Sequence, residues 1–225
     1  MSGVPLRVVS YNVHGLRDDR AALVGLIRDL APDVLVVQEA PRRFRWRQKC
    51  ALLASETGLV VAAGGLPSLG NLLLVSLRVA IRRTWCMRYP LTPGRHLRGA
   101  VFAQGAVRGA AFTVSGSHLA TDPAERPAQA AHWKAELDTV TGPAIVAADL
   151  NEGPGGGAWR TVEDGLLGSS EDVPTFPATV PSRRIDALFV TPDIAIEKYE
   201  IVGTDRARVA SDHLPIVADL LLPSS

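Results

Sequence analysis

The sequence predicts an α+β fold in which two packed β-sheets are flanked by helices. Three observations predict it: many short, apolar, β-rich runs occur along the chain, only a few helical segments lie between them, and no repeat or linker interrupts them. With 225 residues, of which 47% are hydrophobic and 21% charged, the chain is long enough for one large domain with a substantial core. We therefore expect residues 1–225 to form a single domain.

The first part of the chain predicts a strand over 6–11, a helix over 19–30, a strand over 34–38 and a helix over 45–57. The first helix carries Leu23, Leu26 and Ile27 on one face, and Pro32 ends it. Gly58 closes the second helix, because glycine readily adopts the left-handed conformation found after a helix. Both strands are short apolar runs bounded by polar residues, which is typical of buried strands.

The middle of the chain is dominated by β-rich runs, at 59–63, 71–76, 79–87, 99–107 and 110–117. Arg108 and Gly109 separate the last two runs and predict a hairpin turn. Asp122 and Pro123 suit an N-cap and the first helical position, so they predict a helix that runs to about Val140.

The last part of the chain predicts strands at 144–148, 185–190, 198–202 and 216–221. A glycine-rich passage over 153–157 leads into a short helix over 158–163, and a turn-rich segment extends through Pro181. The many strands and few helices of the whole chain suit two sheets with helices packed outside them.

The net charge is +1, but the charges are unevenly distributed. Residues 40–121 contain 12 Lys and Arg against a single acid, Glu56, so this stretch carries +11 and the rest of the chain −10. Such a division suits a protein that holds cations with one part and a phosphate-rich partner with another. The alternative is that these arginines are only solvated surface residues.

The sequence contains no apolar run long enough to span a bilayer, and no basic segment followed by an apolar stretch comes after Met1. Cys50 and Cys86 lie far apart in apolar surroundings, which indicates two reduced, packed thiols. We therefore expect a cytoplasmic protein without a transmembrane segment, acting as a monomer.

The most informative feature is the position of certain acids, amides and histidines relative to the apolar runs. They follow such a run, lie just inside it or precede it: Asn12, Glu39, His118, Asp149, Asp186, Asp212 and His213. A carboxylate at the end of a buried strand is costly unless something compensates it. Several at one rim would form an oxygen-rich site, and Mg²⁺ prefers one or two carboxylates together with water and phosphate. Each residue alone also suits a turn, a cap or a structural role, so the prediction depends on their joint occurrence.

Six segments resemble motifs of the endonuclease/exonuclease/phosphatase superfamily, in that superfamily's order and over nearly the whole chain. They are Ser10-Tyr-Asn-Val-His-Gly15, Val37-Gln-Glu39, Ser117-His-Leu119, Ala148-Asp-Leu-Asn151, Arg184-Ile-Asp186 and Ser211-Asp-His-Leu-Pro215. The superfamily includes pancreatic deoxyribonuclease, apurinic endonucleases, neutral sphingomyelinases and inositol polyphosphate phosphatases. The resemblance implies a metal-dependent phosphoesterase with a four-layer αββα sandwich of two mixed β-sheets, and an active site at one edge of the sheets.

The resemblance also implies a divalent-metal site that takes Mg²⁺, with Mn²⁺ as a substitute. Glu39 is the implied principal ligand, helped by Asn12 and Asp212. Asp149 is implied to orient or deprotonate the attacking water, and with Asn151 it is a candidate ligand near a second ion.

The phosphate contacts that the resemblance implies come from His118, Asn151 and His213. His213 is implied to bind the scissile phosphate or to transfer a proton, with Asp186 fixing its tautomer and favouring its charged form. These roles suit phosphoryl transfer, whose transition state spreads negative charge over oxygens that cations and cationic donors stabilise. Arg98 is a further candidate phosphate contact, unless it is a solvated rim residue.

Three features depart from the motifs and leave the substrate open. Ala147 and Ala148 stand where a small residue and then glycine are usual, and Ala40 follows Glu39 where a basic or aromatic residue is common. The tyrosine that many nuclease members use at the phosphate has only a loose candidate, Tyr89.

Three hypotheses follow. A nuclease acting on DNA or RNA is favoured by the basic stretch and by Phe44, Trp46 and Trp85 among its arginines, unless these rings are core residues. The alternative is a phosphodiesterase or phosphatase acting on a phospholipid head group or small phosphate ester, favoured by the short chain and the leucine-rich segment 66–77. A catalytically inactive binding module would lack a core position, and none is missing. We therefore predict a nuclease.

Overall fold

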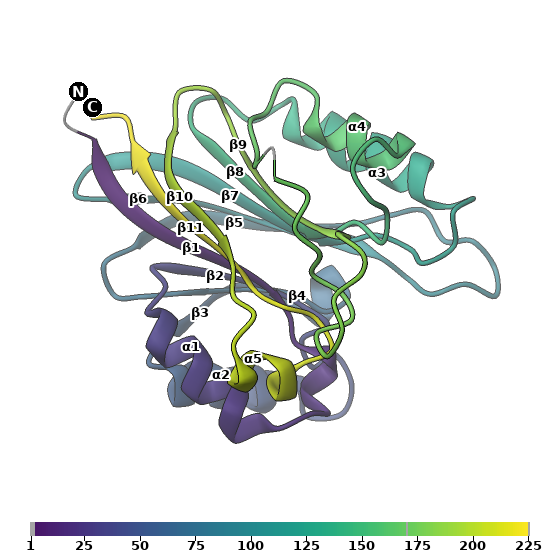
Figure 1. Cartoon of the computed structure of the whole chain (residues 1–225). Helices are drawn as coiled ribbons and strands as arrows, with labels where there is room; N and C mark the ends of the chain where they lie inside the picture. The colour runs from purple at the N-terminus through teal and green to yellow at the C-terminus, as the bar shows by residue number, and fades with distance from the viewer. Residues whose placement is uncertain (1–2, 170, 225) are drawn as a thin grey trace.

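Two β-sheets pack face to face, and helices cover the outer face of each sheet (Figure 1). This computed structural model describes residues 3–169 and 171–224. The layers run helix, sheet, sheet, helix, so the predicted α+β, four-layer αββα sandwich is confirmed. One side carries α1 (Arg20–Leu30), α2 (Trp46–Thr57) and α5 (Asp205–Ala210), and the other carries α3 (Arg126–Leu137) and α4 (Gly157–Glu163).

The first sheet has six strands in the spatial order β10-β11-β1-β2-β4-β3. β1 and β2 pair in parallel while the other neighbours are antiparallel, so the sheet is mixed. The strands are β1 (Val4–Asn12), β2 (Val34–Gln38), β3 (Val60–Gly65), β4 (Asn71–Val75), β10 (Ala195–Ile201) and β11 (Ile216–Leu222).

The second sheet has five strands in the order β5-β6-β7-β8-β9, and it is also mixed. Its single parallel pair is β7 with β8. Each sheet therefore contributes one parallel pair, and the two strands of such a pair end at the same edge. The strands are β5 (Ala80–Arg88), β6 (Gly99–Val107), β7 (Ala110–His118), β8 (Ala144–Asp149) and β9 (Asp186–Val190).

Apolar layers between the sheets and beneath the helices form the core. In β2, Val36 points into the layer between the sheets, whereas Leu35 points to the helical side and shares a buried cluster with Leu23 of α1. This alternation follows from the two-residue period of a strand, and a strand buried on both faces reads as a continuous apolar run. On the opposite side, the second sheet packs against Trp133 of α3 and Trp159 of α4.

Two helical features differ from the sequence prediction. The helix expected from Asp122 begins instead at Arg126, because the Asp122 carboxylate accepts a hydrogen bond from Ala124 N (2.9 Å) and pairs with Arg95 (2.6 Å), which closes a turn. Helix α5 was not predicted, since its six residues are too few to show a helical period. The remaining boundaries differ from the predicted ones by three residues or fewer.

The two cysteines are free, as expected from their spacing, and burial raises the pKa of the Cys50 thiol to about 11. No helix within the described residues has the length and apolar character needed to cross a membrane.

The two sheets approach each other closely at Gly116 of β7, and this contact should be sensitive to substitution. A Cβ at this position would lie 2.4 Å from Val36 Cγ1 in the facing sheet. Because valine is stiff at χ1 and the site is buried, we expect Gly116→Ala to lower the free energy of unfolding by about 1–3 kcal/mol. Urea denaturation measures this, with exposed Gly157→Ala as the control, where a Cβ meets no atom within 4 Å. A wild-type value for Gly116→Ala would show that the sheets can separate there.

Candidate active site

The predicted site residues lie where the parallel strands end, at the end of the sandwich opposite the two termini (Figure 1). In the first sheet Asn12 pairs with Gln38, so Asn12 and Glu39 lie at the same edge. In the second sheet His118 pairs with Asp149, and Asp149 in turn pairs with Asp186 of β9. Strand pairing thus gathers the residues of each sheet at one edge, and the hydrogen bond from Asn12 Nδ2 to Asp149 Oδ2 (2.9 Å) joins the two sheets there.

Asp149 is the centre of this cluster and is only 1% exposed. Its carboxylate accepts hydrogen bonds from Asn12 Nδ2 (2.9 Å) and from the Asn151 backbone N–H (3.0 Å), and His118 Nε2 lies 3.2 Å away. Burial, and then the charge of Asp186, raise the pKa of Asp149 to about 7, although the two hydrogen bonds oppose the shift. Near neutral pH this carboxylate can therefore both hold and release a proton.

His213 is buried beside Asp149 and is held by Asp186. Its Nδ1 lies 2.8 Å from Asp186 Oδ2, its Nε2 lies 3.7 Å from Asp149 Oδ2, and the Phe176 ring packs against it at 4.8 Å between centroids. Burial disfavours the charged ring, but the Asp186 carboxylate outweighs it and raises the pKa of His213 to about 10. His213 is therefore an imidazolium at neutral pH, donating from Nδ1 to Asp186 and carrying a second N–H at Nε2.

His118 lies in the same cluster in the opposite charge state. Burial and the neighbouring Arg98 guanidinium lower the pKa of His118 well below its usual value, so the ring is neutral. Arg98 Nη1 lies 3.1 Å from His118 Nδ1, and an arginine can only donate, which makes Nδ1 the acceptor. His118 Nε2 lies 3.2 Å from Asp149 Oδ2 and 2.9 Å from the Asn151 side-chain nitrogen.

Arg98 and Asn151 supply further donors at this edge. Arg98 Nε is buried and has no hydrogen-bond partner, so one N–H remains for an anion. Asn151 adopts a left-handed backbone conformation (φ 52°), and its side-chain N–H₂ donates to Leu119 O (3.0 Å) and lies 2.9 Å from His118 Nε2.

The three residues predicted to hold the first ion, Glu39, Asn12 and Asp212, lie at the same edge. The Glu39 side chain is 33% exposed and lies 4.0 Å from His118 Nδ1. Asp212 is joined to Asn12 through Ser211, whose hydroxyl donates to Asn12 O (2.7 Å) and lies 3.4 Å from Asp212 Oδ1. In the part of the chain that the structure describes, no hydrogen bond links Glu39 directly to Asn12 or to Asp212.

Within residues 3–169 and 171–224, two groups of histidine and carboxylate atoms are packed closely enough to hold an ion: Asp149, Asp186 and His213, and His14, Asp18 and Asp212. In the first group the His213 imidazolium already pairs with the carboxylates, so its charge would repel a metal ion there. The carboxylates of Glu39 and Asp212, 33% and 35% exposed, and the Asn12 side-chain oxygen are hard ligands at this edge that could hold a divalent cation.

His14 and Phe176 were not predicted as site residues. His14 lies two positions after Asn12, with its Nδ1 2.8 Å from Asp18 and its Nε2 3.8 Å from Asp212. Its signal in the sequence was its place in the first motif, but a positive φ of 47° turns it toward Asp212 and no residue pattern shows this. Tyr89, the loose candidate for the phosphate tyrosine, directs its buried hydroxyl to Ser117 Oγ (2.7 Å).

Comparison with known proteins bears on this arrangement. The model of the Endonuclease/Exonuclease/phosphatase family matches residues 9–213, which is most of the chain and includes every predicted site residue. The chain belongs to the endonuclease/exonuclease/phosphatase family. It is therefore a phosphoesterase, and its family is one of metal-dependent hydrolases. No curated protein sequence matches the chain.

Several solved structures share the fold over nearly their whole length. The D. rerio TDP2 complexed with single strand DNA product has 21% identity and a TM-score of 0.76, covering 96% of this chain and 98% of that one. The human Nocturnin catalytic domain with bound sulfate has 18% identity and a TM-score of 0.80, covering 97% and 95%. The Bacteroides thetaiotaomicron mannosyl-6-phosphatase has 15% identity and a TM-score of 0.78, covering 96% and 100%. At these identities the likeness establishes the family fold, and it leaves the substrate open.

Replacing Asp186 should remove the pH dependence that His213 gives to stability. The folded pKa of His213, about 10, lies above its usual value of 6.5, so protonation stabilises the fold fully below pH 6.5 and this is lost as pH rises to about 10. In Asp186→Asn, burial still disfavours the charged ring and only the weaker influences of Asp149 and Asp212 oppose it, so the pKa of His213 falls toward or below its usual value. We expect urea unfolding in EDTA to give Asp186→Asn a free energy of unfolding a few kcal/mol below the wild-type value at about pH 6. This difference should shrink toward pH 10, and each unit by which the pKa is shifted contributes about 1.4 kcal/mol.

The control is Asp138→Asn, which changes an exposed acid that pairs only with Lys134 on the same helix. It should leave the wild-type pH dependence in place. A gap between wild type and Asp186→Asn that stays constant across this pH range would show that Asp186 does not hold the proton on His213.

Proposed function

We propose that this protein is a divalent-metal-dependent phosphodiesterase that hydrolyses DNA or RNA. One observation carries the proposal: a buried carboxylate with a pKa near 7 lies between a neutral histidine and an imidazolium, beside an open carboxylate. This arrangement combines a proton acceptor, cationic donors and a metal ligand within one cluster, which are the groups that phosphoryl transfer requires.

Glu39 and Asp212 would hold the ion, with the Asn12 side-chain oxygen beside them and Asp149 and Asn151 close enough to contact a second one. The bound Mg²⁺, or Mn²⁺ in its place, supplies Lewis acidity to the phosphate oxygens and neutralises charge that develops on them. Oxygen donors only, with two open carboxylates, favour these hard cations over zinc.

The side chains of the chain perform the remaining steps. His213 donates from Nε2 to an oxygen of the scissile phosphate, and Asp186 holds the ring in the orientation and charge state that this requires. Asp149 orients the attacking water and accepts its proton, and its pKa of about 7 suits a base at neutral pH. Asn151 and the unpartnered Nε of Arg98 donate to the other phosphate oxygens.

Nucleic acid is the preferred substrate because of the charge around the site. Arg98 contacts His118, and Arg42 lies close enough to contribute to the lowered pKa of His118. These arginines belong to the stretch over 40–121 that carries +11, and a phosphodiester polyanion is the substrate that gains most from such a surface. The likeness to a structure that holds a single strand DNA product supports the same choice.

A phosphatase or phosphodiesterase acting on a small ester or lipid head group is the second candidate, favoured by the likeness to a mannosyl-6-phosphatase. The leucine-rich segment 66–77 gives it only limited support, because Leu72, Leu73 and Leu74 are buried in β4 and only Leu66 and Leu77 are exposed.

A substrate panel with and without metal separates the candidates. We expect single-stranded and plasmid DNA or RNA to be cleaved in Mg²⁺ and not in EDTA, with turnover restored by Mn²⁺, because open carboxylates without an ion repel phosphate. Hydrolysis of sugar phosphates or sphingomyelin, with no cleavage of nucleic acid, would assign the second candidate instead.

Replacing His213 should abolish turnover without unfolding the protein. We expect His213→Ala to lower kcat/KM on the preferred substrate by about 10²–10⁴-fold, because it removes the cationic donor to the phosphate. Circular dichroism checks the fold, and exposed His132→Ala on α3 serves as a histidine control that retains wild-type rates. A wild-type rate in His213→Ala would remove the mechanism.

A further inference from the structure

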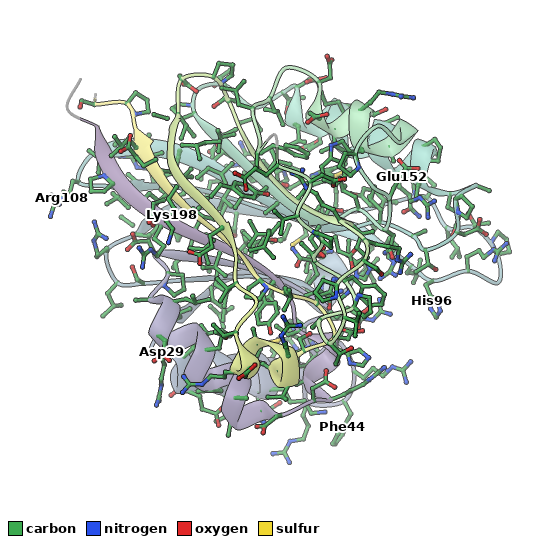
Figure 2. All side chains as sticks on the ribbon, in the orientation of Figure 1. Asp29, Phe44, His96, Arg108, Glu152 and Lys198 are labelled. Atoms are coloured by element: carbon green, nitrogen blue, oxygen red, sulfur yellow. The ribbon has the colours of Figure 1, made fainter. Side chains whose placement is uncertain are left out.

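The loop between Glu39 and α2 exposes a large aromatic ring among arginines. Phe44 is 83% exposed, and Figure 2 shows its side chain pointing away from the ribbon. Arg43 and Arg45 flank it and are also exposed. A single exposed apolar residue needs no explanation by itself. Phe44 differs from an ordinary exposed residue because cations flank it and because it lies only a few residues from Glu39.

The cations beside Phe44 have no counter-ions. Among the residues the structure describes, no carboxylate lies within 4.0 Å of Arg43, Arg45 or Lys49, and the Arg47 guanidinium rests on the Trp46 ring (4.5 Å). Several arginines elsewhere are paired with carboxylates, as Arg7, Arg20, Arg78, Arg95 and Arg206 are. The loop therefore presents positive charge that is free to meet an anionic partner.

Contacts made by Ala40 and Arg42 hold the start of this loop beside Glu39. Arg42 Nη1 donates to Leu69 O (3.0 Å) and to Leu97 O (3.3 Å), and Ala40 N donates to Gly70 O (2.8 Å). Phe44 follows Glu39 by five residues, so their Cα atoms are at most about 18 Å apart, or about five nucleotides at 3.4 Å each. One short oligonucleotide can therefore reach both the site and the ring.

We propose that Arg43, Phe44 and Arg45, with Arg47 in the first turn of α2, form a surface that binds single-stranded nucleic acid in preference to duplex; this set of residues is called here the cationic loop. The inference rests on the proposed function and deepens it. A base stacks on the Phe44 ring while the arginines contact the flanking phosphates. In a duplex, neighbouring base pairs cover the base faces, so an exposed ring gains stacking only from an unpaired strand.

Binding without turnover tests the cationic loop directly. Fluorescence anisotropy in EDTA follows the full-length protein with a labelled oligothymidylate of about 12 nucleotides, and with the same length of duplex. We expect Phe44→Ala to weaken single-strand binding about 5–150-fold, with Phe44→Trp restoring it, because stacking of one base contributes about 1–3 kcal/mol. We expect Arg43→Ala with Arg45→Ala to reduce the salt dependence by about 0.7 per lost phosphate contact.

Leu77→Ala is the matched control, since Leu77 is 89% exposed and lies beside Arg78 in the turn between β4 and β5. It should bind the oligonucleotide as the wild type does, and the thermal midpoint of Phe44→Ala should equal the wild-type value. Cleavage in Mg²⁺ is scored separately: Phe44-dependent binding without cleavage contradicts the proposed function but not the cationic loop.

Three results would overturn the cationic loop. Equal single-strand affinity in Phe44→Ala and wild type would show that the ring does not stack. Duplex binding as tight as single-strand binding would remove the preference. Phe44-dependent binding to vesicles of phosphatidylcholine and phosphatidylglycerol, with none to the oligonucleotide, would make this loop a membrane contact.

Discussion

The burial of the Asp149 carboxylate is the constraint on which the site depends. A carboxylate that is 1% exposed must be compensated, and here Asn12 and the Asn151 backbone donate to it, with His118 Nε2 3.2 Å and the His213 imidazolium 3.7 Å away. Its pKa of about 7 shows that this compensation is incomplete, because full compensation would hold the pKa near or below its usual value. The incomplete compensation destabilises the ionised Asp149 carboxylate, and for that reason the carboxylate can accept a proton at neutral pH.

The sandwich architecture brings these groups together without any long insertion. Each sheet contains one parallel pair, β1 with β2 and β7 with β8, and the four strands carry their polar residues just past the apolar run. Had either pair been antiparallel, Asn12 and Glu39, or His118 and Asp149, would lie at opposite ends of the molecule. His213 reaches the same end because β11 runs antiparallel to β1, so the residues before β11 lie beside the end of β1. The close packing at Gly116, two residues before His118, then fixes how near the two halves of the site come.

Most of the strands and the site carboxylates could be predicted from the sequence, because buried strands are continuous apolar runs and an acid directly after such a run is easily recognised. What could not be predicted depends on tertiary contacts. Phe44, Trp46 and Trp85 are alike in sequence, as rings among arginines, yet Trp46 packs on Gly65 and Trp85 stacks on Phe102 (4.9 Å) while Phe44 stays exposed. Helix α5 is too short for a period to appear, and the turn that delays α3 is closed by Asp122, a residue that suits an N-cap equally well.

Negative charge gathers in the site and positive charge in the loop after Glu39, and this separation divides the proposed binding into two steps. In the site, the carboxylates of Glu39, Asp149, Asp186 and Asp212 outnumber the cations His213 and Arg98, so a polyanion meets a net negative cluster until a divalent ion is held there. The unpaired cations of the loop after Glu39 lie outside this cluster and attract phosphate whether or not the ion is present. On the proposal made above, capture of a strand and engagement of its scissile phosphate would be separable, and only the second would depend on the metal.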